Sequence, residues 1–188
     1  MKRIGFLLLA ATTVLAACNN NKSGEKKEIT INPVQNAAED VEKQKEELSK
    51  LQTLNPDQLK AMIPESLVGA KRTNVEVNFS MGAGLASGEY ELNDSSSISL
   101  NIYDCGGPAG AGIYSMQYLG LLNDLHDNDE EYLKSIDFNG GKAFEQCDKT
   151  ANDCTISYFS GGRFLVTLQG DHVGVDALKQ AARGLNIK

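Results

Sequence analysis

The sequence has few basic residues, and it lacks the residue spacing of several common metal and nucleotide sites. It has 18 lysines and arginines against 25 aspartates and glutamates, which gives a formal net charge of −7. Because nucleic acids and anionic lipid headgroups attract cations, this balance disfavours both as partners of the folded part of the chain. No two cysteines are spaced as Cys-x-x-Cys, so the sequence does not indicate a zinc site.

Two glycine-rich runs, at residues 82–88 and 106–112, lack the marks of nucleotide binding. Neither contains the lysine of a P-loop, and neither shows the full glycine fingerprint of a dinucleotide site. The acidic run 127–131 and the pair Asp148 and Asp153 lack the spacing of a calcium-binding loop. We therefore interpret the glycines as flexible connections and the acidic residues as solvated turns. No cofactor and no metal ligand is expected.

The first eighteen residues have the pattern of an export signal. Two basic residues precede an apolar run at residues 4–14, and small residues follow before a cysteine. The run is too short for an ordinary membrane-spanning helix, and no later stretch is apolar for eighteen residues. The motif Leu15-Ala16-Ala17-Cys18 resembles the lipobox of bacterial lipoproteins.

That resemblance implies a cellular location and a lipid anchor. Residues 1–17 would be a signal peptide, and Cys18 would become the first residue and carry acyl chains such as palmitate. More than one acyl chain gives stable attachment to a membrane. Asn19 stands where an aspartate would retain a Gram-negative lipoprotein in the inner membrane. We therefore expect a lipid-anchored protein of the bacterial cell envelope, attached to the outer membrane.

Removal of the signal peptide also changes the composition. It would leave 171 residues, enough for one domain with a core plus an extension. It takes away Lys2 and Arg3, so that 16 basic residues face 25 acidic ones and the net charge becomes about −9. The expected contact with the membrane is therefore through the acyl chains on Cys18, and no nucleic-acid partner is expected.

Three cysteines remain if Cys18 carries lipid. The envelope is an oxidising compartment, and Cys147 and Cys154 flank a polar run rich in turn-forming residues. Two strand ends joined by such a turn lie side by side, within reach of a disulfide. We predict the bond Cys147–Cys154, which would stabilise the fold by about 2–3 kcal/mol on the chain-entropy model. The alternatives are three reduced thiols, or Cys105 paired with one of the other two.

A tether and a helical spacer are expected before the main domain. Residues 18–33 are polar and predict a flexible tether. Residues 34–63 predict a helical spacer, with a first helix over 34–53 that lies on the domain or acts as a stalk. Its apolar residues recur every seventh position, at Val34, Val41 and Leu48. A short second helix is predicted between Asn55 and Pro64.

Residues 64–188 predict an α+β domain. Strands are expected at 75–79, 89–92, 97–103, 133–138, 142–147, 154–159 and 163–169. Two helices are expected, an apolar one at 111–126 that lies on the sheet and a C-terminal one at 175–184. Because the strands are grouped rather than alternating with helices, we expect an antiparallel sheet of about six to seven strands, with both helices packed on one face.

Four short phrases of residues 64–188 resemble a set of uncharacterised bacterial envelope lipoproteins. The phrases are Pro64-Glu65-Ser66-Leu67, Met81-Gly82-Ala83-Gly84, Gly162-Arg163-Phe164-Leu165-Val166 and Val175-Asp176-Ala177-Leu178-Lys179. The resemblance implies no particular activity. The element order is also similar to that of PsbP-like α+β domains, which concerns architecture and fixes no function.

A second resemblance defines an alternative function. Asp104-Cys105-Gly106-Gly107 and His172-Val173-Gly174-Val175 are similar to two phrases of NlpC-type cell-wall cysteine peptidases. That similarity implies a cysteine hydrolase with Cys105 as nucleophile and His172 as general base. A thiol before a helix is also a position where backbone N–H groups lower a thiol pKa. The sequence departs from the family in Gly106, which replaces a serine.

The function we expect is non-catalytic binding by a lipid-anchored envelope protein. The ligand is either a small apolar molecule or an envelope protein. An apolar molecule would lie between the 111–126 helix and the sheet, whereas a protein partner would meet the acidic 34–53 helix. The cysteine hydrolase is the alternative, and it requires Cys105 and His172 within hydrogen-bond reach of one another.

Overall fold

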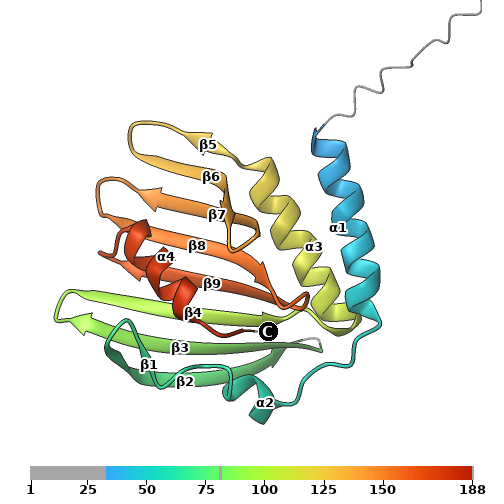
Figure 1. The fold of residues 1–188 in the computed structure, drawn as a ribbon, viewed down its shortest axis with the longest axis horizontal. Helices are drawn as coiled ribbons and strands as arrows, with labels where there is room; N and C mark the ends of the chain where they lie inside the picture. The colour runs from blue at the N-terminus through green and yellow to red at the C-terminus, as the bar shows by residue number, and fades with distance from the viewer. Residues whose placement is uncertain (1–32, 81, 188) are drawn as a thin grey trace, which may run out of the picture. The chain divides into compact units, whose positions relative to one another are not determined.

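The computed structural model describes residues 33–80 and 82–187 (Figure 1). The helices are α1 (Pro33–Ser49), α2 (Pro56–Lys60), α3 (Gly107–Asn123) and α4 (Val175–Gly184). The strands are β1 (Ser66–Leu67), β2 (Ala70–Ser80), β3 (Ala83–Asn93), β4 (Ser96–Asp104), β5 (His126–Asp127), β6 (Glu131–Phe138), β7 (Gly141–Asp148), β8 (Asp153–Ser160) and β9 (Phe164–Asp171). They form one sheet in the order β1-β2-β3-β4-β9-β8-β7-β6-β5.

Every neighbouring pair in this sheet is antiparallel. Two meanders, β2-β3-β4 and β6-β7-β8-β9, meet at the central pair β4 and β9, and α3 makes the crossover between them. The predicted antiparallel sheet with helices is therefore confirmed. The predicted strand number is too small, because the described residues contain nine strands. β1 and β5 have two residues each, too few to show the alternation by which strands are recognised.

The first face of the sheet is covered by α2 and α4. Ile98, Leu100 and Ile102 of β4 point to this face and are fully buried, together with Leu178 of α4 and Leu59 of α2. In Figure 1, α4 lies in front of the sheet, across the middle strands. This is the larger of the two buried clusters, and it runs from α2 at one end of the sheet to Phe138 of β6 at the other.

The second face is covered at one end by α3 and α1, which lie side by side (Figure 1). Tyr103, Leu165 and Phe159 lie opposite one another on β4, β9 and β8, and they pack against Tyr114 of α3. Val41 and Leu48 of α1, predicted to form its apolar stripe, are buried in the same cluster.

The prediction that the helices expected at 111–126 and 175–184 pack on one face of the sheet is wrong. α4 packs on the first face and α3 on the second, because the strands carry apolar residues on both sides near the end where α3 begins. Alternation along a strand identifies a buried face, but it does not say which helix covers that face. α3 is also less buried than its composition suggests, since the Met116 side chain is 68% exposed.

The bounds of two helices differ from the predicted ones. α1 ends at Ser49 rather than near residue 53. α3 begins at Gly107 rather than residue 111, because Pro108 fits a first helical turn, where no N–H bond is lost. It ends at Asn123, so His126 lies in β5 and not at a helix end. α2 begins as predicted, since Asn55 caps it.

The glycine-rich run after β2 is mostly strand rather than a loop. Residues 83–88 belong to β3, and two of its glycines are required by close packing under α2. A Cβ atom at Gly84 would lie 2.4 Å from Leu59 Cδ1, and one at Gly88 would lie 2.4 Å from Ile63 Cγ2. The glycines therefore let Leu59 of α2, and Ile63 just after it, pack closely onto the sheet.

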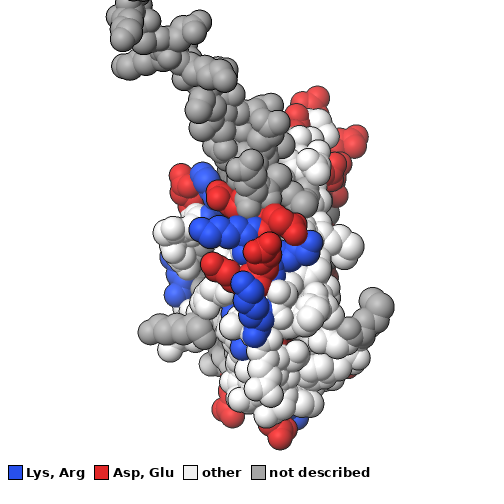
Figure 2. All heavy atoms as spheres, turned by 90° about the vertical axis from the view of Figure 1, so that its right-hand side faces the viewer, with Lys and Arg blue, Asp and Glu red and all other residues white. Residues whose placement is uncertain are grey.

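α1 belongs to the same compact unit as the sheet, which spans residues 32–188. The helix therefore lies on the domain, the first of the two alternatives considered for it. Its outer side mixes charges: Figure 2 shows acidic and basic side chains intermingled on this side of the molecule, and Lys45 pairs with Glu42 at 3.1 Å. No helix within the described ranges is long and apolar enough to cross a membrane.

Candidate functional site

The predicted pair Cys105 and His172 is not brought together. The Cys105 N–H donates to the carbonyl of Arg163, just before β9 begins, whereas His172 follows the last residue of β9. The intervening strand places the two residues roughly 25–30 Å apart, at about 3.3 Å per residue. The cysteine-hydrolase hypothesis required them within hydrogen-bond reach, so this pair cannot act as nucleophile and base.

Cys105 also has the environment of an inert thiol. It is the free cysteine of the described residues and is fully buried. Burial raises the pKa of the Cys105 thiol to about 12, and its Sγ donates a weak bond to the Tyr103 carbonyl. A thiol that is protonated at neutral pH and inaccessible is not a nucleophile.

The predicted disulfide Cys147–Cys154 is present. The two residues lie directly opposite one another on β7 and β8, with their Cα atoms 4.1 Å apart. Both side chains are buried in the cluster of the first face. Cys18, its lipobox, the signal peptide 1–17 and most of the tether 18–33 lie outside the described residues.

Next to Cys105 lies a buried ion pair that connects four segments of the chain. Asp104 Oδ1 accepts from Arg163 Nε at 2.7 Å, and Oδ2 accepts from Arg163 Nη2 at 2.9 Å. The N–H groups of Leu54 and Gly106 donate to the same carboxylate at 2.8 and 2.9 Å. Burial alone would raise the pKa of Asp104, but the bonds from Arg163, Leu54 and Gly106 outweigh it and hold that pKa below its usual value.

Arg163 extends this pair toward a hollow in the described surface. Its Nη2 also donates to the carbonyl of Gln52 at 2.6 Å, which fixes the link between α1 and α2. Its Nη1 makes no hydrogen bond with any residue that the structure describes. The side chain is 18% exposed and lines the hollow.

The hollow is a groove of about 680 Å³ between α2 and the segment that follows α4. Three stretches far apart in the sequence line it: residues 54–64, residues 161–164 and residues 184–186. Its apolar lining consists of Leu54, Ala61, Met62, Pro64, Phe164 and Leu185. Its polar lining includes Gln58, Arg163 and Asn186. A mainly apolar wall with a few polar groups, at this volume, is typical of small-molecule sites.

The apolar ligand was predicted at another place, between the 111–126 helix and the sheet. A hollow of about 380 Å³ does lie between α3 and the sheet, where Gly120 and Leu121 face the second side. Its floor is polar, since it is formed by Asn101, Ser157, Thr167, Gln169 and the edge of Tyr103. A polar floor does not suit an apolar ligand, so this part of the prediction is not supported by the geometry.

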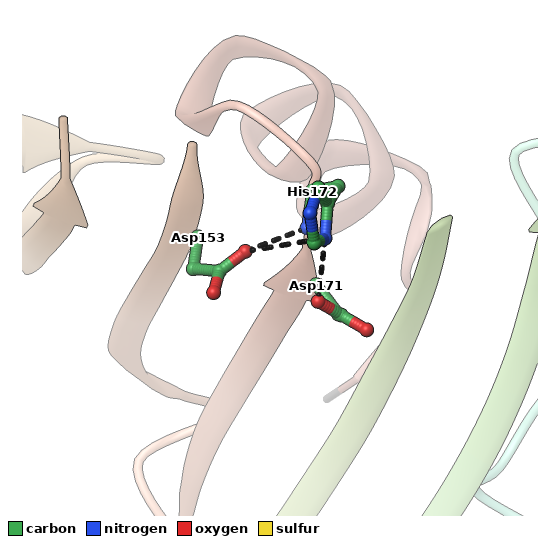
Figure 3. A group of neighbouring side chains, drawn as sticks. All are labelled: Asp153, Asp171 and His172. Carbon is green, nitrogen blue, oxygen red and sulfur yellow. Dashed lines mark hydrogen bonds and ion pairs between the residues drawn. The ribbon is translucent and has the colours of Figure 1, made fainter. Parts of the chain in front are cut away.

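Three exposed side chains at the far end of β9 lie close enough to share a cation. Asp153, Asp171 and His172 each offer one ligand atom, and these atoms lie within 4.8 Å of one another (Figure 3). His172 Nδ1 lies 2.7 Å from Asp171 Oδ1, and the His172 N–H donates to Asp153 at 2.7 Å. The two carboxylates raise the pKa of His172, Asp171 having the larger effect. The hydrogen bonds of His172 to the two aspartates explain this geometry without a metal.

A second buried carboxylate lies beneath α4. Glu145 of β7 is 2% exposed, and its oxygens lie 2.8 Å from Lys134 Nζ and 2.5 Å from Lys179 Nζ. Tyr132 donates to it at 3.1 Å. Burial would raise the pKa of Glu145, but the two lysines hold it below its usual value. This cluster joins α4 to the sheet, and every charge in it has a partner.

Neither the groove nor the two buried carboxylates could be read from the sequence. Asp104 and Arg163 are 59 residues apart, and nothing in their neighbourhoods marks them as a pair. No family model matches this chain, and neither a curated protein nor a solved structure is significantly similar to it. The geometry and chemistry of the described residues are therefore the basis on which a function can be proposed.

Proposed function

We propose that this protein is a lipid-anchored lipoprotein of the bacterial cell envelope, whose domain binds a small amphipathic molecule without catalysing a reaction. The observation that carries the binding proposal is the groove of about 680 Å³ between α2 and the segment after α4. The anchor is supported by the lipobox at Leu15–Cys18 and by the polar stretch that follows it, which has the composition of a tether. Asn19, which stands in place of a retaining aspartate, supports attachment to the outer membrane.

The lining of the groove supports an amphipathic ligand rather than a purely apolar one. Leu54, Met62 and Leu185 would contact an apolar body. Arg163 Nη1 and the amides of Gln58 and Asn186 would bind a polar end that accepts hydrogen bonds. Because Arg163 is already paired with Asp104, the polar end would be bound by hydrogen bonds and not by an unpaired cation. A single-chain lipid or a fatty acid has both parts.

A protein partner that docks through α1 is less well supported. The apolar residues Val41 and Leu48 are buried against α3 and are not available to a partner. The exposed side of α1 mixes both signs of charge, so it offers no patch of a single sign (Figure 2). We therefore propose the groove, rather than α1, as the site of recognition.

The binding proposal is tested with lauric acid and an environment-sensitive fluorescent probe that it displaces. Ala61 is exposed in the wall of the groove, so Ala61→Trp should fill the groove and weaken binding at least about tenfold. The matched control is Ser95→Trp in the β3–β4 turn, which is exposed and remote from the groove. Equal affinity in the two variants would place the ligand elsewhere, and no displaceable probe binding would remove the proposal.

The anchor is tested separately, by metabolic labelling with an alkyne analogue of palmitate. The full chain should incorporate the label and fractionate with membranes, whereas Cys18→Ala should do neither. Labelling that persists in Cys18→Ala would show that the lipobox does not direct acylation. Failure of this experiment would leave the groove proposal standing, because the two depend on different residues.

A further inference from the structure

One edge of the sheet is open over most of its length. β2 pairs with β3 from Arg72 to Ser80, whereas β1 pairs with Ala70 and Lys71 alone on the other side. The Arg72 N–H also reaches the carbonyl of Glu65, so the covered part ends at residue 72. From Thr73 to Ser80, the outer edge of β2 has no strand partner among the residues that the structure describes. These eight residues span about 26 Å.

This open edge lacks the devices that usually protect an edge strand. Residues 73–80 contain no proline, lysine or arginine, and Glu76 is their one charged residue. The irregularity in the β2–β3 register lies at Arg72 and Asn74, beside β1, and the rest of the strand is regular. A regular edge without lysine, proline or a bulge is a template for pairing with another strand.

The opposite edge of the same sheet is protected. β6 carries charges of both signs along its length, at Glu131, Lys134 and Asp137, and β5 covers its beginning. Lys142 of the neighbouring β7 forms an ion pair with Asp137 at 2.6 Å. The β2 edge is therefore the better template for further pairing, because it lacks these charges.

The sequence of the open edge is complementary to itself. Val75, Val77 and Phe79 point to the first face, and Phe79 is 44% exposed. In an antiparallel pairing centred on Val77, Val75 lies opposite Phe79 of a second copy, and Val77 lies opposite itself. Aromatic and β-branched residues directly opposite one another stabilise a sheet.

The polar side of the same register also matches. Glu76 lies opposite Asn78 of the second copy, and Asn74 lies opposite Ser80. The Glu76 carboxylate accepts from Asn74 at 3.2 Å within one chain and has further lone pairs for a second amide. A register centred on Glu76 would place two carboxylates opposite each other, which is unfavourable. The register centred on Val77 pairs residues 74–80 of each copy and stops before residue 72, where β1 occupies the edge.

We propose that two copies of this chain pair through β2, antiparallel and centred on Val77, so that their sheets form one continuous sheet. The two-fold axis is perpendicular to the sheet, so the first faces of both copies lie on the same side. The contact is isologous and uses up both open edges, so the assembly closes as a dimer. Anchoring both copies in one membrane would raise their effective concentration and favour the pairing.

The register is tested by cysteine cross-linking of the full lipoprotein in isolated envelope membranes. Opposite residues in an antiparallel pair have Cα atoms about 4.5–5.5 Å apart, within disulfide range. Val77→Cys should therefore give a covalent dimer on a non-reducing gel after mild oxidation. Phe79→Cys is the matched control, because two copies of residue 79 would lie about 13 Å apart along the strands. The double variant with Val75→Cys and Phe79→Cys should cross-link again.

Sedimentation in detergent gives the second measurement. The unmodified protein should sediment as a dimer, and Val77→Lys should weaken association at least tenfold, because it places two cations opposite each other. Val77 lies at an edge and is half-buried, and circular dichroism checks that the variant is folded. Equal cross-linking at Val77 and Phe79, no dimer of Val77→Cys, or a monomer for the unmodified protein would overturn the proposal.

Discussion

The two faces of the sheet are built from the same strands but are covered in different ways. On the first face, α2 and α4 bury a continuous apolar layer from β2 to β6. On the second face, α3 and α1 cover aromatic residues at one end, and hydroxyl and amide side chains occupy the middle. Ser87 donates to Asn101 there at 2.7 Å, and Ser157 bonds Thr167 at 3.0 Å. The first face therefore supplies most of the hydrophobic stabilisation, and the second supplies a polar surface.

The largest loss of stability is expected at the link between the two faces. The chain passes from α1 on the second face to α2 on the first, and Asp104 and Arg163 hold that link through Leu54 and Gln52. Asp104→Ala leaves Arg163 without its counter-charge, and we expect a loss of about 3–5 kcal/mol in the free energy of unfolding. Urea denaturation measures it. Asp94→Ala, at an exposed turn, should change less than about 0.5 kcal/mol.

The stability difference between the wild type and Asp104→Ala should depend on pH. Because the pKa of Asp104 is lower in the folded protein than in the unfolded chain, its contribution is complete above the unfolded value of about 4. It is lost as the pH falls through the folded value. The stability gap between the wild type and Asp104→Ala should therefore shrink between pH 5 and strongly acidic conditions. A gap that stays constant would show that Asp104 acts through packing instead of charge.

A pair of leucine variants measures the two faces against each other. Leu178 of α4 is fully buried on the first face, so Leu178→Ala should cost about 2–4 kcal/mol. Leu121 of α3 is half-buried over the polar floor, and Leu121→Ala should cost less than about 1 kcal/mol. Urea denaturation of both variants gives the comparison. Equal losses would mean that α3 contributes to the core as much as α4 does.

The disulfide at the far end of the first face should have a smaller effect. Replacing Cys147 and Cys154 together by serine should cost about 2–3 kcal/mol, because the closed loop is short. Cys105→Ala is the control for loss of a buried sulfur, and it should cost about 1 kcal/mol. Thermal unfolding under oxidising and reducing conditions provides the check. Equal sensitivity to reductant in wild type and double variant would show that the bond is not formed.

The smallest effect is expected on the polar floor of the second face. Ser157→Ala removes a bond to Thr167 but leaves that hydroxyl near other polar groups, so the cost should be about 0.5–1 kcal/mol. Chemical denaturation with closely spaced points resolves a change of this size. A loss well above 2 kcal/mol would mean that the polar network stabilises the second face as strongly as burial stabilises the first.

Local patterns in the sequence predicted the long elements and the antiparallel sheet, but not which helix covers which face. The long strands and the Cys147–Cys154 bond follow from alternation and from a short turn-forming run, so both were predictable. Which helix covers each face was not predictable. The apolar helix α3 leaves Met116 exposed, whereas α4 buries Leu178. Tertiary packing, which no local pattern records, decided that outcome.

The same limit applies to the sites. Cys105 and His172 stood beside motif-like phrases but lie at opposite ends of β9. The groove forms from three stretches that meet only in the fold. Gly84 and Gly88 looked like loop residues, because the sequence does not show that Leu59 and Ile63 press against them. Contacts between distant residues created each of these features.

The ion pair of Asp104 and Arg163, with its bonds to Gln52 and Leu54, forms a clamp that also has a mechanical consequence. For a domain held at its N-terminal side, a pulling force would enter at the beginning of α1 and first peel that helix from α3, one turn at a time. The load would then reach Gln52 and Leu54, where the clamp ties the chain to the ends of β4 and β9. There the force would act on several charged hydrogen bonds at once, and the sheet would resist as a unit. α1 would thus serve as an extensible segment in series with a stiff body.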